Sequence, residues 1–257
     1  MSEGLPTAST PPIEMVHDLR PISLRELDEA ASLQVRVDRK YVVDGDQLER
    51  LVEELAHRLA VLDIDGSRSF GYESTYFDTP SLDSYLGAAH RRRRRFKVRT
   101  RSYVDSSTTM LEVKTRGPRG ATVKRRRRHR YDLRHELGRE GEAFVADAIG
   151  RAHVAETLRP TLTTSYRRVT LIDLDEVARV TVDADLWCAD RSGNAVGLAD
   201  RYVLETKSSS SPSPTDRLLW AGGIRPERIS KYGTGLAALH PELPSNKWHR
   251  TIGRHFT

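Results

Sequence analysis

The stretch Phe96-Lys-Val-Arg-Thr-Arg101 carries a basic side chain at every second position, and this spacing decides the fold. Alternate residues of a β-strand point to the same face, so Lys97, Arg99 and Arg101 line one face of a strand while Val98 lies on the other. The same alternation, with carboxylates among the charged positions, recurs in Glu112-Val-Lys114, Arg179-Val-Thr181-Val-Asp183 and Glu205-Thr-Lys207. The sequence therefore predicts strands that each have one charged face and one apolar face.

Several such strands cannot all direct their charges toward a core. A closed sheet solves this problem by enclosing the charged faces around a wet, strongly positive interior, which suits a polyanion. We therefore expect an α+β fold in which an antiparallel, β-barrel-like tunnel is flanked by helices.

The charge of the chain also predicts an acidic partner. The 257 residues carry a net charge of +6, and much of it comes from two basic runs, Arg91–Arg95 and Lys124–Arg128. A nucleic acid is one polyanion that such runs bind, but the chain has no RNP-like aromatic signature and no zinc-finger spacing. These features argue against nucleic acid as the partner. Because consecutive strand residues alternate faces, we expect some of Arg91–Arg95 to form a basic rim at the tunnel mouth.

Other features concern the location of the protein. No apolar run reaches the roughly 18–20 residues that cross a bilayer, and the first residues lack the pattern of a secretory signal. The single cysteine, Cys188, excludes an intramolecular disulfide and a cysteine-based zinc site. A cytoplasmic location, with no membrane segment, is the expectation.

The chain divides into three expected parts. Residues 1–17 are rich in Pro, Ser and Thr and are predicted to be disordered, residues 18–240 to form the tunnel domain, and residues 241–257 to be a C-terminal tail. A capping-box spacing at Asp46–Glu49 predicts a helix whose apolar face is Leu48, Leu51, Leu55 and Leu59. Further helices are expected at 140–151 and 214–220, and strands at 35–43, 74–77, 95–103, 109–115, 121–131, 162–173, 177–186 and 201–208.

The order of these motifs resembles the polyphosphate-polymerase (vacuolar transporter chaperone, VTC) domain of the triphosphate tunnel metalloenzyme, or CYTH-like, superfamily. The resemblance covers about residues 30–240. Its motifs are Arg36-Val-Asp-Arg-Lys40-Tyr41, Ser74-Thr-Tyr-Phe-Asp78-Thr, Phe96-Lys-Val-Arg99-Thr-Arg101, Leu111-Glu-Val-Lys114, Thr122-Val-Lys124-Arg-Arg, Tyr166-Arg-Arg168, Arg179-Val-Thr-Val-Asp183, Leu204-Glu-Thr-Lys207 and Ser230-Lys-Tyr232.

The resemblance implies a tunnel that holds a triphosphate or a growing polyphosphate chain. In that family a nucleoside triphosphate donates its γ-phosphoryl group to the end of polyphosphate, with a divalent metal, Mn²⁺ or Mg²⁺. Carried over position by position, the metal-binding carboxylate is Glu205. The phosphate-binding and catalytic candidates are Lys40, Arg99, Arg101, Lys114, Lys124, Arg168, Lys207 and Lys231.

The residue types agree with phosphoryl transfer. Arginine binds phosphate with a rigid fork and lysine with a movable point charge, while a carboxylate-bound cation bridges phosphate oxygens. Tyr41, Tyr166, Ser230 and Tyr232 lie in matching motifs and are expected only to frame the tunnel. The remaining carboxylates are either internal countercharges or alternative metal ligands: Asp38, Glu112 and Asp183.

Two alternatives to a polymerase stay open. Hydrolytic members of the superfamily carry Glu-x-Glu-x-Lys on the first strand, whereas this chain has Arg36-Val-Asp38-Arg-Lys40, which favours the polymerase over a triphosphatase or polyphosphatase. The presence of Glu205 argues against a non-catalytic module that only binds polyphosphate or nucleotides. The expected partners are thus a nucleoside triphosphate and inorganic polyphosphate, and the sequence leaves protein partners open.

Overall fold

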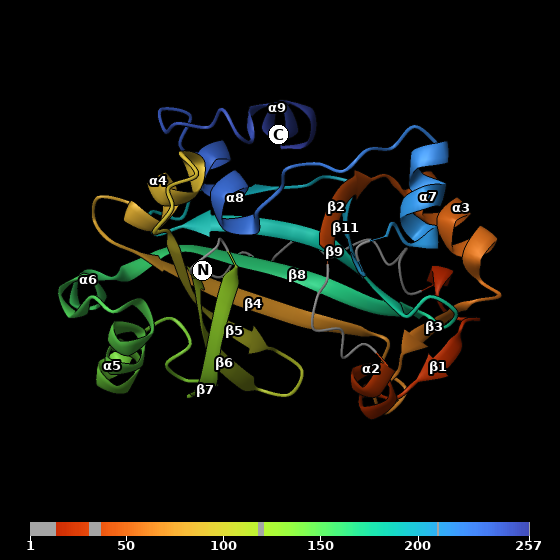
Figure 1. The fold of residues 1–257 in the computed structure, drawn as a ribbon, viewed down its shortest axis with the longest axis horizontal. Coiled ribbons are helices and arrows are strands. Elements are labelled where there is room, and N and C mark those ends of the chain that lie inside the picture. Colours follow the sequence, from red (N-terminus) through yellow and green to blue (C-terminus); the bar gives the residue numbers. More distant parts are fainter. Residues whose placement is uncertain (1–13, 31–36, 118–120, 210, 257) are drawn as a thin grey trace. The chain divides into compact units, whose positions relative to one another are not determined.

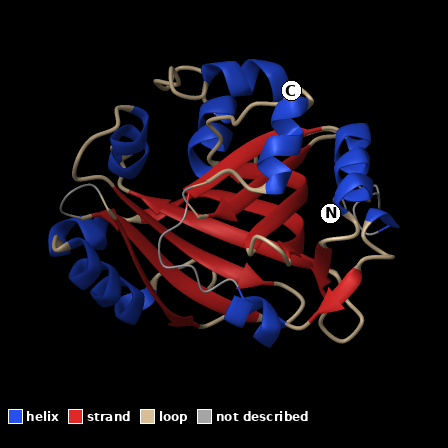
Figure 2. Ribbon diagram, turned by 45° about the vertical axis from the view of Figure 1, so that its right-hand side comes forward, coloured by secondary structure: helices blue, strands red, loops and turns tan. Residues whose placement is uncertain are grey.

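The computed structural model describes residues 14–30, 37–117, 121–209 and 211–256. It is a mixed α+β fold with a large, mostly antiparallel sheet and flanking helices, which confirms the predicted fold class (Figures 1 and 2). Arg36, most of the predicted disordered segment (residues 1–13) and part of the loop after Arg116 lie outside the described residues. The chain forms two compact units, and long strands β8 (Arg159–Asp173) and β9 (Ala178–Asp190) contribute residues to both.

The first unit holds, as far as they are described, Met1–Phe70, Arg167–Asp185 and Leu198–Glu227. Its complete strands are β1 (Arg20–Ile22), β2 (Val37–Val43), β3 (Leu59–Leu62) and β11 (Tyr202–Ser208), and its helices are α2 (Leu24–Ala30), α3 (Gly45–Leu55) and α7 (Pro214–Ala221). Strand β11 pairs antiparallel with β2 on one side and with β9 on the other. Strand β3 pairs antiparallel with β8 and parallel with β1.

The two faces of β2, β11 and β9 differ as the alternation predicts. Val180, Val182 and Leu204 are buried in one core cluster, together with residues of α3. The intervening charged residues fall on the opposite face, because Glu205 pairs with Lys40 and Lys207 pairs with Asp38 across the β11–β2 ladder. In the first unit the period-two pattern therefore places apolar core residues on one face of the strands and charged residues on the other.

Helix α3 begins two residues earlier than predicted and ends sooner. Its capping box uses Asp44, whose side chain accepts from the backbone N–H of Gln47 while the Gln47 side chain accepts from the Asp44 N–H. Asp46, predicted to open the helix, lies in the first turn instead. Leu59, predicted on the helix face, lies in β3 and packs into the same core from there. Helices α3 and α7 lie side by side (orange and light blue in Figure 1).

The second unit holds Gly71–Tyr166, Leu186–Gly197 and Arg228–Thr257, as far as they are described. A meander of four antiparallel strands forms its main sheet: β4 (Ser69–Asp78), β5 (Phe96–Tyr103), β6 (Thr108–Arg116) and β7 (Thr122–His129). Strand β10 (Ala195–Gly197) pairs with the end of β9. The helices are α4 (Asp83–Ala89), α5 (Gly138–Ile149), α6 (Ala152–Thr157), α8 (Lys231–Leu239) and α9 (His249–His255).

Helices α5 and α6 cover the apolar face of this meander. They pack against each other (green in Figure 1), and Val145 of α5 and Val154 of α6 join Phe96, Val98 and Leu111 of the strands in one buried cluster. Lys97, Arg99 and Arg101 alternate with these apolar residues and point to the opposite face of the meander.

Helix α8 was not predicted, because two glycines near its start weaken the helical pattern. Both glycines are required by close packing. A Cβ at Gly233 would overlap the indole ring of the buried Trp248, and a Cβ at Gly235 would lie 2.6 Å from the Sγ atom of Cys188. The helix thus forms where only glycine lets its backbone approach its neighbours.

In each unit the described pairings leave an edge strand, which has a hydrogen-bonded partner on one side only. In the first unit β2 has only β11 as a described partner, and in the second unit β7 has only β6. The described strand pairings therefore do not close the sheet into a barrel by hydrogen bonds, which differs from the closed tunnel expected from the sequence.

Candidate functional site

The second unit carries a surface that we call the cation-rich face: Lys97, Arg99, Arg101, Lys114, Lys124 and Lys231, with Glu112 among them. The ladder registers bring the strand residues together. Arg99 of β5 pairs with Glu112 of β6, and Lys114 of β6 pairs with Lys97 on one side and Lys124 of β7 on the other. In strands, directly opposite residues share a face, so these cations gather around Glu112, together with Arg126 of β7, which lies opposite Glu112.

Glu112 is the countercharge of this face. Its side chain is 3% exposed, and its carboxylate binds Arg99 Nη2 at 2.6 Å and Lys124 Nζ at 2.5 Å. Burial alone would raise the pKa of Glu112, but Arg99, Arg101 and Lys124 outweigh burial and hold that pKa well below its usual range. Among the described strand residues of this face the cations outnumber the carboxylates, so the face retains positive charge.

Lys114 shows the effect of this surplus. The Lys114 side chain is exposed, but the charged groups of Arg99 and Lys124 lie near its ammonium. Desolvation, followed by repulsion from Arg99 and Lys124, lowers the pKa of Lys114 to about 8. An anion bound beside Lys114 would favour its charged form.

Tyrosine rings hold the cations of this face in place. The Tyr76 and Tyr232 rings stack with centroids 5.0 Å apart, and Lys97 Nζ lies 5.7 Å and 6.0 Å from these two centroids. Lys231 Nζ lies 4.2 Å from the Tyr166 ring. Such contacts stabilise the positive charge of a lysine side chain.

Tyr232 is itself anchored by a buried carboxylate. Its hydroxyl donates to Asp78 Oδ2 at 2.5 Å, and the Asp78 carboxylate also accepts the backbone N–H groups of Thr79, Ser84 and Tyr85 at the start of α4. Burial raises the pKa of Asp78, although these hydrogen bonds oppose the shift. The Asp78 motif therefore has a positioning role, fixing both α4 and the ring beneath Lys97.

The first unit carries a different surface, the mixed-charge face: Lys40, Lys207 and Arg168, with Asp38, Glu205 and Asp183. Arg168 binds Asp183 through two hydrogen bonds of 2.5 and 2.8 Å. Arg179, opposite Lys207 in the ladder, pairs with Asp28 at 3.0 Å instead. Three cations thus meet three carboxylates, and the face is close to electrically balanced.

Glu205 lies between two lysines of this face. Its carboxylate is 2.5 Å from Lys207 Nζ and 3.6 Å from Lys40 Nζ. Burial would raise the pKa of Glu205, but the ammonium groups of Lys40 and Lys207 outweigh burial and hold that pKa well below its usual range. The carboxylate is therefore ionised at neutral pH, as a ligand of a hard cation must be.

The surroundings of Glu205 fit a divalent cation in one further respect. Thr181 pairs with Glu205 across the β9–β11 ladder, and its buried hydroxyl has no hydrogen-bond partner among the described residues. Within those residues no group of three or more His, Cys, Asp or Glu side chains converges. Glu205 and the Thr181 hydroxyl would then supply only part of a coordination shell, as is usual for a Mg²⁺ that also binds substrate phosphates.

The structure places the predicted residues in two sets. Arg99, Arg101, Lys114, Lys124 and Lys231 belong to the second unit, and Lys40, Arg168, Lys207 and Glu205 to the first. Tyr41 faces the core instead of the charges, donating from its hydroxyl to Asp216.

Lys97 and Tyr76, which lie at the cation-rich face, are absent from the phosphate-binding candidates predicted from the sequence. Lys97 follows the same alternation as Arg99, which was a sufficient signal, and its ammonium donates to Ser230 Oγ at 3.1 Å. Tyr76 could not be recognised, because its role depends on stacking with the distant Tyr232.

Comparison with known proteins gives a family match and several similar folds. The family model of the VTC domain matches residues 35–240. No curated protein matches the sequence. Among the part of the chain that the structure describes, no helix has the length and apolar character needed to span a bilayer.

Three solved structures illustrate the similarity in fold. A candidate adenylate cyclase from Vibrio parahaemolyticus has 13% identity and a TM-score of 0.44, covering 77% of this chain and 95% of that one. A candidate adenylyl cyclase from Hippeastrum, described as having a dominant triphosphatase activity, has 14% identity and a TM-score of 0.48 over 78% of this chain and 94% of that one. A protein from Pyrococcus horikoshii has 14% identity and a TM-score of 0.38 over 74% and 88%.

Proposed function

The chain belongs to the VTC domain family, and from this we propose that it is a metal-dependent polyphosphate polymerase. It would transfer the γ-phosphoryl group of a nucleoside triphosphate to the end of a polyphosphate chain. The observation that carries the proposal is the cation-rich face, where the described strand cations outnumber the carboxylates and Glu112 is bound by Arg99 and Lys124. A site with this surplus attracts a molecule that carries several negative charges close together.

Phosphoryl transfer needs positioning and charge neutralisation more than covalent chemistry by the protein. The bond between the γ-phosphorus and its bridging oxygen breaks, the nucleoside diphosphate leaves with that electron pair, and an oxygen of the terminal phosphate of the chain forms the new bond. Arg99 and Arg101 would bind equatorial phosphate oxygens through their planar forks, while Lys114 and Lys124 would follow the moving charge. Lys97, beside the stacked rings of Tyr76 and Tyr232, would add positive charge to the phosphate site.

A divalent cation, Mn²⁺ or Mg²⁺, would be held by Glu205 with the Thr181 hydroxyl. When bound, it would act as a Lewis acid that offsets negative charge on phosphate oxygens. In the structure, Lys40 and Lys207 both pair with the Glu205 carboxylate. If a divalent cation bound Glu205 in their place, the two ammonium groups could bind phosphate instead.

The test is incubation of the purified protein with ATP and Mn²⁺, followed by separation of phosphate products by size, with a chelator-treated sample as control. We expect chains longer than triphosphate. Orthophosphate as the only product would identify a triphosphatase or polyphosphatase, and binding without product would identify a non-catalytic module.

A further inference from the structure

A pocket of the second unit lies where β5 begins and β6 ends. It has a volume of about 380 Å³ and is lined by the paired residues Phe96 and Thr115 and by the segment Ala148–Arg151 at the end of α5. Phe96 directly precedes Lys97 in β5, and Thr115 directly follows Lys114 in β6. The Phe96 and Thr115 side chains therefore point to the opposite, helix-covered side of the sheet. We call this site the arginine pocket, after Arg94, Arg95, Arg116 and Arg151.

The arginine pocket holds positive charge without a countercharge. No carboxylate is among its described lining residues, and none of its four guanidinium groups forms an ion pair with a described Asp or Glu. The pKa of Arg95 is lowered by burial and then by repulsion from Arg116. Four cations held together in this way form a site that an anion would stabilise.

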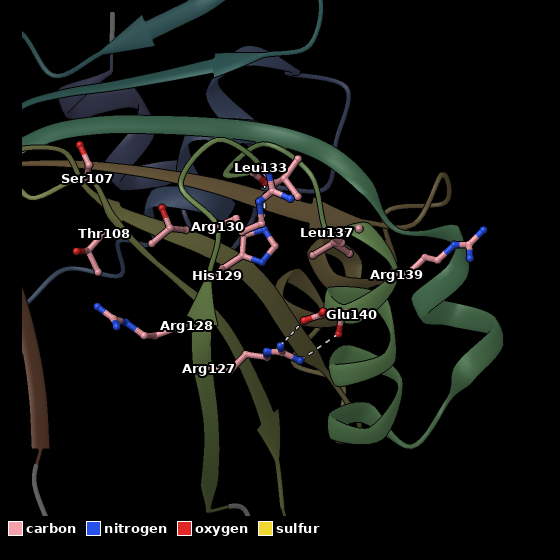
Figure 3. A pocket seen from close by; sticks show the side chains of 12 residues that line it. Ser107, Thr108, Arg127, Arg128, His129, Arg130, Leu133, Leu137, Arg139 and Glu140 are labelled. Carbon is pink, nitrogen blue, oxygen red and sulfur yellow. Dashed lines mark hydrogen bonds and ion pairs between the residues drawn. The ribbon is translucent and has the colours of Figure 1, made fainter.

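Neighbouring arginines of the same unit behave differently. At the other end of α5 lies a pocket of about 520 Å³, in which Arg127 reaches across to Glu140 with an Nη2–Oε2 distance of 2.7 Å (Figure 3). Arg125 pairs with Asp147 at 2.6 Å, and Arg134 pairs with Glu73 at 2.9 Å. The lack of carboxylates is thus a property of the arginine pocket and not of every arginine on the helix-covered side.

Two of the four arginines are held in position. The Arg151 guanidinium lies over the Phe96 ring, 5.4 Å from its centroid, and donates to the backbone carbonyl of Arg94 at 3.4 Å. The Arg95 guanidinium donates to the Arg92 carbonyl at 3.1 Å, and a Cβ at Gly87 of α4 would lie only 3.1 Å from the Arg95 Cβ. This close approach restricts the Arg95 backbone, so less conformational entropy is lost when a ligand binds.

A structural explanation of the cluster is that the arginines complement the C-terminal end of α5. That helix end carries a partial charge equivalent to about −0.5 and acts over about one turn. It offsets less than one of the four guanidinium charges. Most of the positive charge of the arginine pocket is therefore left for an external anion.

We propose that the arginine pocket is a second anion site, which binds a tetrahedral phosphate group. The ligand is inorganic phosphate or an end group of a condensed phosphate, since both present oxygens that match the guanidinium fork. The site lies at the edge of the sheet, next to the cation-rich face, because Arg116 follows Lys114 by two positions in β6. It does not depend on the proposed polymerase activity.

The test is calorimetric titration with tripolyphosphate at 0.15 M salt, using R94Q/R116Q and the matched control R92Q/R93Q. Arg92 and Arg93 are exposed members of the same basic run that do not line the pocket, so both variants lose two charges. We expect two classes of site in the unaltered protein and in R92Q/R93Q. In R94Q/R116Q one class should weaken about ten- to a hundredfold, since hydrogen bonds to charged groups are the stronger kind.

Separate titrations with orthophosphate and long-chain polyphosphate identify the source of the ligand. Binding of orthophosphate that R94Q/R116Q weakens would indicate free phosphate, and weakening seen only with condensed phosphates would indicate a chain end. Thermal unfolding of each variant reports whether it is folded. Unchanged stoichiometry and affinity in folded R94Q/R116Q, or equal losses in both variants, would overturn the proposal.

Discussion

The cation-rich face and the mixed-charge face have the same strand alternation but different charge balances. Among the described residues of the cation-rich face the strand cations outnumber the carboxylates, whereas in the first unit the charges of Lys40, Lys207 and Arg168 are matched by carboxylates. An unbalanced face gains most from binding an anion, while a balanced face can exchange one of its cations for a metal. The proposed function accordingly assigns phosphate binding to the cation-rich face and divalent-cation binding to the mixed-charge face.

The largest expected effect comes from Glu205→Gln, which keeps the side-chain size but removes the charge. Turnover with ATP and Mn²⁺ should fall by about two to four orders of magnitude, because metal stabilisation of a phosphoryl transition state is worth several kcal/mol. Tripolyphosphate should still bind, since a negative charge has been lost. Rates measured over a range of Mn²⁺ concentrations provide the check.

The control for this substitution is Glu54→Gln, which changes an exposed carboxylate of α3. Near-normal turnover of Glu205→Gln with unchanged metal dependence would show that Glu205 is only a countercharge. Asp38 or Asp183 would then be the better ligand candidate on the mixed-charge face.

A smaller effect should separate the two faces by affinity. Lys114→Ala removes a cation with no carboxylate of its own and should weaken tripolyphosphate binding about ten- to a hundredfold. Lys40→Ala should weaken binding less, because Glu205 already offsets the Lys40 charge. Equilibrium titrations of both variants decide the matter, and a larger loss with Lys40→Ala would reverse the assignment of the two faces.

The pH dependence of binding tests the surplus charge directly. The lowered pKa of Lys114, about 8, means that the free protein loses this charge as the pH rises through that value. Because an anion prefers the charged form, tripolyphosphate affinity should fall severalfold between about pH 7 and pH 9. Lys114→Arg should abolish most of this decline, since arginine remains charged. An unaltered pH profile in Lys114→Arg would mean that another group titrates.

The smallest effect concerns the exposed part of the Arg91–Arg95 run. Arg92→Gln together with Arg93→Gln should slow tripolyphosphate association a few-fold at low ionic strength and have little effect at 0.15 M salt. Stopped-flow association rates at the two salt concentrations measure this. Equal slowing at both would indicate direct contact with the ligand and not long-range attraction.

How much the sequence could predict depends on the range of the interactions involved. The period-two alternation correctly separates Val98 from Arg99 and Leu204 from Glu205, because strand geometry is local. The charge balance of each face depends on ladder registers, such as Glu112 opposite Arg99, which no single strand reveals. The same limit explains Leu59, whose place in β3 is set by pairing with Asp173 of β8.

The glycines of α8 have a practical consequence for measuring motion. Gly235 lets the helix backbone close over Cys188, the only cysteine of the chain, and burial raises the pKa of that thiol to about 12. A buried, protonated thiol does not react with alkylating reagents. The rate at which Cys188 is alkylated would therefore measure how often α8 separates from its neighbours. The unmodified chain thus allows local opening beside Lys231 to be followed without an introduced label.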